Sequence, residues 1–133
     1  METAAAVDPR DYSDARNFEN SESLLSKRVI YFDFDKSNVK AEYRGIIAAH
    51  AAYLAAHSSA RITLEGHADE RGTREYNVAL AERRAQAVKQ LMLYEGAGND
   101  QISIISYGEE KPVAFGHDDE SMSLNRRVEI VYQ

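Results

Sequence analysis

The side chains with the clearest chemistry lie between Gly66 and Ala85. This stretch follows a short apolar segment and consists of a polar loop and the start of a long helical pattern. Open α/β sheets tend to bind their ligands at such strand-to-helix loops. Asp69 lies in the loop, and Arg84 follows fifteen residues later in the helical pattern. Together they would offer a carboxylate for the ammonium and a guanidinium for the carboxylate of a zwitterion. We therefore treat this pair as a hypothetical binding site.

A structural salt bridge between Asp69 and Arg84 would explain the same pattern. Structural pairs satisfy the geometry as well as ligand-binding pairs do, so the sequence leaves both interpretations open. Gly66 and Gly72 bracket the loop, and their freedom from side chains would let the backbone approach a small molecule. We take these two glycines as support for ligand binding.

The helical wheel separates Arg84 from its neighbour Arg83. At about 100° per residue, Arg84 and Asn77 flank the apolar stripe of this helix, whereas Arg83 points to solvent. The stripe consists of Ala81, Ala85, Val88 and Met92. A guanidinium at the edge of a core needs an acceptor, because burying it unpaired is costly. We expect Arg84 to be the functional arginine, in an exposed-edge pair that contributes little to stability.

Hydrophobic periodicity predicts the elements that would position this pair. Alternating and β-branched residues indicate strands at 28–35, 62–65, 102–107 and 127–132. Helical periodicity indicates helices at 40–56 and from a Thr73 cap to about residue 95, with Gly96 as terminator. The first strand would place Ile30, Phe32 and Phe34 on one face, and residues 108–122 would form a polar loop.

The order of these elements predicts an α/β (α+β) sandwich of βαβαββ type, with a four-stranded mixed sheet and helices on one face. The chain has 133 residues, which suits one domain and a tail. Residues 1–22 show no sustained period, so we expect a flexible tether there and a packed domain over 23–133.

Composition excludes several classes of function. The net charge of -6 disfavours a nucleic-acid binder, which needs a basic surface for phosphates. The chain has no cysteine, which excludes thiolate metal sites, and it has no apolar run of the roughly 18 residues that a membrane helix needs. None of its four histidines shows the paired spacing of a zinc site, and His50 falls on the apolar side of a helix as a core residue would. We expect no metal and no cofactor.

A second acidic pair suggests an alternative activity. The string Asp33-Phe34-Asp35-Lys36-Ser37 superficially resembles the D-x-D nucleophile motif of haloacid-dehalogenase phosphatases. That motif expects Thr or Val where Ser37 stands, and its fold is larger and parallel. A hydrolase that uses Asp33 and Asp35 is therefore the minor alternative, beside a strand end whose acids are solvated or cap the next helix.

Four ordered motifs carry a resemblance to a known family, over about residues 29–132. They are Gly66-His67-Ala68-Asp69-Glu70-Arg71-Gly72-Thr73, then Tyr76-Asn77 with Leu80 and Arg83-Arg84-Ala85, then Ser106-Tyr107-Gly108-Glu109-Glu110-Lys111-Pro112, and Asn125-Arg126-Arg127-Val128-Glu129-Ile130. Together they resemble the OmpA-like peptidoglycan-binding domain. The resemblance implies a module without catalytic activity that binds the diaminopimelate of the peptide stem in Gram-negative peptidoglycan.

The resemblance also implies roles for particular residues. Asp69 would meet the ammonium of the diaminopimelate, and Arg84 would meet a carboxylate. The loop residues Phe34, Asp35, Lys36 and Ser37 would supply backbone donors. The pocket would be shaped by Thr73, Asn77 and Leu80.

Within the family, the E-R-G-T and S-Y-G-E-E-K-P strings favour the lipoprotein branch of the Tol-Pal system over a porin C-terminal domain or a MotB-type stator. That branch implies a periplasmic location at the outer membrane, an N-terminal lipid anchor, and TolB and other Tol proteins as partners. The anchoring cysteine and its signal peptide are absent from these 133 residues, so the lipid anchor is an inference.

Overall fold

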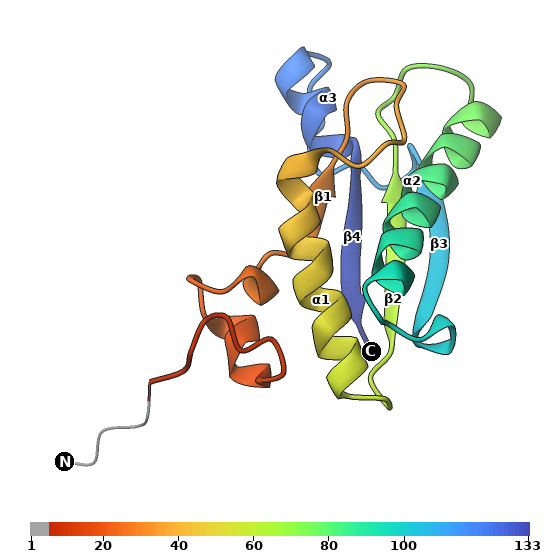
Figure 1. The fold of residues 1–133 in the computed structure, drawn as a ribbon. Helices are drawn as coiled ribbons and strands as arrows, with labels where there is room; N and C mark the ends of the chain where they lie inside the picture. Colours follow the sequence, from red (N-terminus) through yellow and green to blue (C-terminus); the bar gives the residue numbers. More distant parts are fainter. Residues whose placement is uncertain (1–5) are drawn as a thin grey trace.

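Four strands form one mixed sheet in the computed structural model, which describes residues 6–133 (Figure 1). The strands are β1 (Val29–Tyr31), β2 (Ile62–His67), β3 (Ile102–Gly108) and β4 (Arg127–Tyr132). Their order in the sheet is β1-β4-β2-β3. β2 and β3 are parallel, and β4 is antiparallel to both β1 and β2. The predicted mixed sheet is confirmed.

Two long helices cover one face of this sheet, as the sequence predicts (Figure 1). They are α1 (Arg44–Ala56), preceded by a 3-10 turn at Ala41–Tyr43, and α2 (Arg74–Tyr94). Thr73 caps α2, since its side chain accepts a hydrogen bond from the Tyr76 N–H at 3.1 Å. Gly96 follows α2 with a φ of 110°, so both predicted ends are confirmed. Between residues 6 and 133, no helix combines the length and apolarity needed to span a membrane.

The core lies between the sheet and these helices, and Gly66 sets how closely they pack. A Cβ at Gly66 would lie 2.1 Å from the carbonyl oxygen of Ala81, so only glycine lets α2 lie this close to β2. Gly66 therefore serves helix packing, which differs from its expected role in ligand approach. The buried core includes Ile30, Phe32, Ile47, Leu54, Ile62, Leu64, Val88, Met92, Val128 and Ile130.

β1 is shorter than predicted, and the reason lies in the turn that follows it. Asp35 has a φ of 56°, and the Lys36 N–H donates to the Asp33 carbonyl at 3.2 Å. Aspartate tolerates this left-handed conformation, which a strand does not use. Phe34 therefore lies within the turn, and its side chain is 52% exposed instead of sharing the buried face of Ile30. The prediction that Phe34 belongs to that face is wrong.

The predicted loop at 108–122 is also partly wrong, because it leads into a short helix, α3 (Asp119–Asn125). Asp118 is the N-cap of α3 and accepts from the Ser121 N–H at 3.1 Å. Of the three consecutive acids, Asp118 is the cap, and Asp119 and Glu120 lie in the first turn, where negative charge interacts favourably with the helix dipole. A helix of seven residues is too short to show an apolar period in the sequence.

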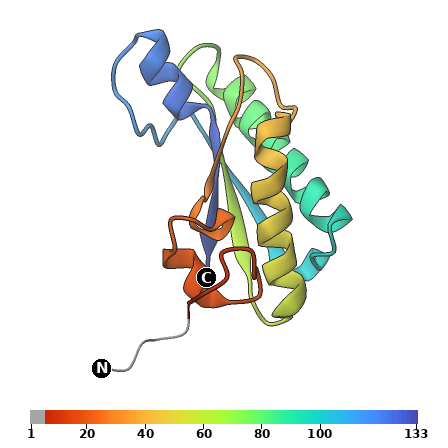
Figure 2. The same ribbon diagram turned by 60° about the vertical axis from the view of Figure 1, so that its left-hand side comes forward.

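The N-terminal segment differs from the expected tether over residues 8–22. It contains a 3-10 helix at Ala15–Glu19 and lies beside the lower end of α1, near the C-terminus of the chain (Figure 2). The Phe18 ring packs edge-on against Tyr53 and Tyr132, with centroids 4.7 Å apart in each case. These aromatic contacts attach the segment to the domain. Residues 1–5 lie outside the described residues, and the boundary at residue 23 stays a prediction.

Candidate functional site

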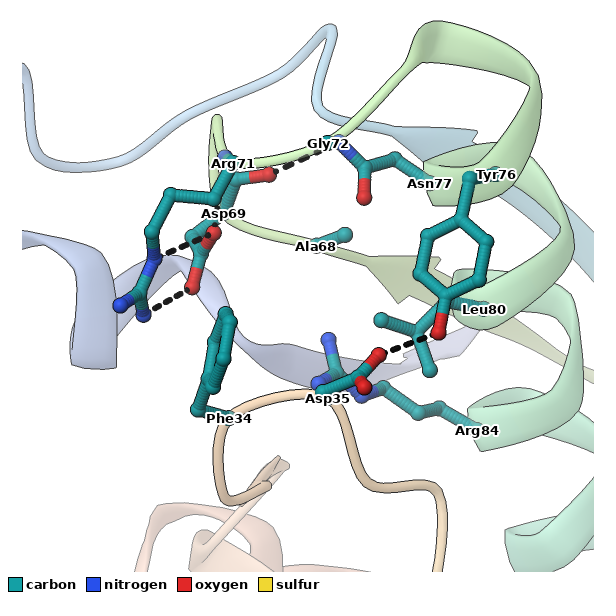
Figure 3. Close-up of a pocket in the computed structure, with 10 residues that line it drawn as sticks. All are labelled: Phe34, Asp35, Ala68, Asp69, Arg71, Gly72, Tyr76, Asn77, Leu80 and Arg84. Atoms are coloured by element: carbon teal, nitrogen blue, oxygen red, sulfur yellow. Dashed lines mark hydrogen bonds and ion pairs between the residues drawn. The ribbon is translucent and has the colours of Figure 1, made fainter.

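A cavity of about 230 Å³ lies where β2 ends and α2 begins, and the loop after β1 forms its other side (Figure 3). It is lined by Phe34, Asp35, Ala68, Asp69, Arg71, Gly72, Tyr76, Asn77, Leu80 and Arg84. The structure thus brings together six of the nine predicted site residues, namely Phe34, Asp35, Asp69, Asn77, Leu80 and Arg84. Their segments are far apart in the sequence, so the fold alone assembles the cavity.

Arg84 is fully buried at the base of the cavity and is bonded to backbone rather than to a carboxylate. Its Nε donates to the Lys36 carbonyl at 2.9 Å. Its Nη1 donates to the His67 carbonyl at 2.9 Å, and its Nη2 to the Asp33 carbonyl at 3.1 Å. One guanidinium therefore joins α2 to the end of β2 and to the loop after β1. The expected exposed-edge location is wrong, whereas the prediction that Arg84 faces inward and Arg83 faces solvent is confirmed. That Arg84 is the functional arginine stays a prediction.

Arg84 remains positively charged although it is buried. Burial lowers the pKa of Arg84 to about 10, while the charge of Asp69 opposes that shift. The guanidinium is thus protonated at neutral pH. A guanidinium has five N–H groups, and three of those of Arg84 donate to the carbonyls named above. Two N–H groups remain for an anion in the cavity.

Asp69 supplies the negative charge of the cavity. Its side chain is 4% exposed and pairs with Arg71 at 2.8 Å and with Arg126 at 3.3 Å. Burial alone would raise the pKa of Asp69, but the hydrogen bonds from Arg71 and Arg126 hold that pKa below its usual value. Asp69 is therefore ionised at neutral pH. Among the described residues, no direct bond joins it to Arg84, so the structure does not contain the salt bridge that the sequence left open as an alternative.

Apolar and amide groups complete the cavity. Figure 3 shows Phe34 and Tyr76 on opposite sides of the opening, with Leu80 beside the Arg84 guanidinium. Asn77 is buried, and its Nδ2 donates to the Asp69 carbonyl at 3.2 Å, which holds the loop against α2. The space between the charged ends thus has walls that suit an alkyl chain.

Three predicted site residues lie outside this lining. Lys36 contributes its carbonyl to Arg84, and Ser37 continues the same loop. Thr73 is exposed, and its side chain is used as the cap of α2. Their predicted direct contact with a ligand stays a prediction, whereas their structural contribution is to position the loop and the helix.

Two lining residues, Arg71 and Tyr76, were missing from the predicted site. Arg71 lies two positions after Asp69, so the sequence already shows a basic residue close to the acid. The Tyr76 hydroxyl donates to the Asp35 carboxylate across the mouth of the cavity (Figure 3). No sequence pattern indicates that second contact, because it joins the first turn of α2 to the loop after β1, which only the fold brings together.

The hydrolase alternative is not supported by the positions of its two acids. Asp35 lines the cavity described above, whereas Asp33 lines a separate cavity of about 260 Å³ beside α3. The Asp33 carboxylate accepts from Lys40 at 3.3 Å, and the Asp35 carboxylate accepts from Tyr76. A nucleophile and an acid–base group must reach one substrate atom. These two carboxylates face different spaces.

His50 occupies the core, as predicted. It is fully buried, with Nδ1 2.7 Å from the Tyr132 hydroxyl and Nε2 2.7 Å from the Lys27 carbonyl. Burial lowers the pKa of His50 to about 4, so the ring is neutral at pH 7. Over residues 6–133, no three His, Asp or Glu side chains gather as metal ligands would.

Several known proteins are similar to this chain in sequence and in fold. Residues 31–126 match the family model described as OmpA family. A peptidoglycan-associated lipoprotein of Pasteurella multocida is 50% identical over 104 residues, which cover 78% of this chain and 69% of that protein.

Solved structures give the same result. The crystal structure of the peptidoglycan-associated lipoprotein from Burkholderia pseudomallei is 45% identical, with a TM-score of 0.85, and the match covers 87% of this chain and 98% of that one. The C-terminal domain of Helicobacter pylori MotB shares only the fold, at 23% identity and a TM-score of 0.74 over 80% of this chain and 84% of that one. On the sequence match, this chain belongs to the OmpA family.

Proposed function

We propose that this chain binds peptidoglycan non-covalently, by holding the side chain of diaminopimelate in the cavity at the end of β2. The observation that carries the proposal is one cavity with a carboxylate, Asp69, and a buried guanidinium, Arg84, in its wall. Diaminopimelate ends in a carbon that bears both an ammonium and a carboxylate, so it matches this pair. As a member of its family the chain is not an enzyme.

In the proposed complex, each end of the ligand meets the opposite charge. The ammonium lies against Asp69, and the carboxylate accepts from the two remaining N–H groups of Arg84. The alkyl stem lies between Phe34 and Leu80, which removes apolar surface of both partners from water. Backbone N–H groups of residues 34–37 other than that of Lys36, which donates to Asp33, complete the binding of the carboxylate, and Asn77 and Thr73 hold the walls in place.

At the level of the cell, we propose that the module links the outer membrane to the cell wall from the periplasmic side. The relatives matched here carry the name peptidoglycan-associated lipoprotein, which supports a lipid-anchored protein at that membrane. TolB and other Tol proteins are its proposed partners.

Calorimetry with two tripeptides tests the proposal. One tripeptide ends in meso-diaminopimelate, and the control ends in lysine, which lacks the carboxylate on the carbon that carries the side-chain amine. We expect the diaminopimelate peptide to bind at least tenfold more tightly, because the lysine peptide leaves the Arg84 donors unpaired. Equal affinity for the two peptides would refute the proposed role of Arg84. No binding of either peptide, and no co-sedimentation with purified peptidoglycan, would refute the proposed function.

A further inference from the structure

The Asp69 carboxylate is already paired with cations of the protein itself. Its Oδ1 accepts from the Arg71 backbone N–H at 2.9 Å and from Arg71 Nε at 3.3 Å. Its Oδ2 accepts from Arg71 Nη2 at 2.8 Å and from Arg126 Nη1 at 3.3 Å. A ligand ammonium must therefore share or replace one of these partners.

The two arginines differ in how firmly they are held. Arg126 is 14% exposed in its side chain, and its Nε donates to the Phe32 carbonyl at 2.9 Å. The Arg71 side chain is 36% exposed and lies at the mouth of the cavity, with its guanidinium carbon 3.8 Å from the centre of the Phe34 ring. Besides Asp69 and this ring, the Arg71 side chain makes no hydrogen bond within residues 6–133. Arg71 is thus the cation that can leave (Figure 3).

We propose that Arg71 is a resident counter-ion of Asp69, which the ammonium of the ligand displaces on binding. The inference rests on the proposed function and adds a residue that determines specificity. A carboxylate as buried as Asp69 needs a cation at all times, because an unpaired buried charge is costly. Arg126 stays on Oδ2 in both states, while the second cation is the Arg71 guanidinium in the free protein and the ammonium in the complex.

The exchange makes the site selective for a charged amine. An ammonium gains the contact with Asp69 and repels the Arg71 guanidinium, whose stem can turn into solvent without leaving a buried group unpaired. A ligand whose amine is acylated has no charge to offer, so Arg71 keeps its place. The Arg71 backbone N–H stays on Oδ1 in either state and keeps the carboxylate aimed at the cavity.

The competition predicts that removing the Arg71 charge strengthens binding of the amine. In Arg71→Met the side chain still covers Phe34 but no longer competes, so the diaminopimelate tripeptide should bind roughly two- to fivefold more tightly, as expected for losing a partly exposed ion pair. The same tripeptide with its side-chain amine acetylated should change by less than about twofold. Arg71→Lys restores a competing cation and should return the affinity of the free amine to near that of the wild type.

Calorimetry of the three proteins with both tripeptides is the test, with thermal unfolding as the check on folding. Weaker binding of the free amine by Arg71→Met would overturn the inference, because it would make Arg71 a ligand contact. An equal change for both tripeptides would also overturn it, since a merely structural residue affects both alike. If the wild type binds neither tripeptide, the proposed function itself fails.

A second measurement uses the wild type alone. The NMR signal of the Arg71 Nε–H group reports its bond to Asp69. On saturation with the free-amine tripeptide, this signal should move to the position of a solvent-exposed arginine, whereas the acetylated tripeptide should leave it unchanged. A signal that keeps its bonded position at saturation with the free amine would contradict displacement.

Discussion

Two buried polar side chains, Arg84 and His50, lie at opposite ends of the interface between the helices and the sheet. Both are fully buried, and both bond to backbone carbonyls of distant segments. His50 uses both of its ring nitrogens within the protein, on Tyr132 and Lys27. Arg84 uses three of its five N–H groups and borders a cavity of about 230 Å³.

The difference between these two regions lies in what remains unpaired. At the His50 end, packing closes over the ring, and the aromatic side chain of Phe18 covers it from the N-terminal segment. At the Arg84 end, charge and donors are left facing a space with an acid in its wall. Arg84 thus has N–H groups without a hydrogen-bond partner among residues 6–133, whereas both ring nitrogens of His50 have one. The predictions below test this contrast.

The largest effect is expected from Arg84→Met, which should lower both stability and binding. The change leaves three backbone carbonyls without their donor, one in a buried bond and two in partly buried bonds, and an unpaired buried acceptor costs about 1–3 kcal/mol. We expect a loss of at least about 3 kcal/mol, or roughly 10 °C in Tm, and no measurable co-sedimentation with peptidoglycan. Arg83→Met, on the exposed side of the same helix turn, is the matched control and should leave both nearly unchanged. Wild-type stability in Arg84→Met would show that the carbonyl bonds contribute little.

His50 should influence the dependence of stability on pH without influencing binding. Its folded pKa is about 4, below the roughly 6.5 of an unfolded histidine. The unfolded chain therefore binds the proton first, and stability falls as the pH drops from about 6.5 to 4, by up to about 3 kcal/mol. His67, whose pKa burial also lowers to about 4, should add a similar loss. Denaturation of His50→Gln across this range should show a shallower slope. An unchanged slope would mean that His50 is not kept neutral.

Asp69→Asn should have its main effect on binding. The amide keeps the shape of the side chain but cannot pair with an ammonium, and a hydrogen bond to a charged group contributes about 1.5–3 kcal/mol. Affinity for the diaminopimelate tripeptide should fall roughly ten- to hundredfold, measured by calorimetry. Because the folded pKa of Asp69 is depressed, wild-type binding should persist at pH 5 and be lost only as the pH falls through that pKa. A sharp loss of binding between pH 7 and 5 would contradict the ionised carboxylate.

Phe18→Ala gives the smallest of these effects and tests the N-terminal segment. The ring is partly buried against Tyr53 and Tyr132, so its loss should cost about 1–2 kcal/mol of stability and leave peptidoglycan binding unchanged. Urea denaturation measures the first quantity, and co-sedimentation measures the second. If the variant were as stable as the wild type, the aromatic contacts would not hold residues 8–22 to the domain, and the segment would be the flexible tether that the sequence suggests.

Local patterns in the sequence predicted much of the fold. The cap at Thr73 and the terminator at Gly96 set the limits of α2, and β4 begins and ends where alternation placed it. The helical wheel also identified Arg84 as the buried member of the arginine pair. The short helix α3 and the early end of β1 were missed, because neither seven residues nor one left-handed aspartate gives a periodic signal.

The sequence alone thus determined most of the elements, the inward-facing side of α2, the charged residues Asp69 and Arg84 of the cavity, and the resemblance to a family. Only the tertiary structure decided their partners. Arg84 bonds carbonyls that lie 17, 48 and 51 positions away, and Asp69 pairs with Arg126 across 57 positions. Periodicity indicates which way a side chain points from its own helix or strand, but it gives no information about the distances between elements. For that reason the pair that looked like a salt bridge proved to be two separate charges facing one cavity.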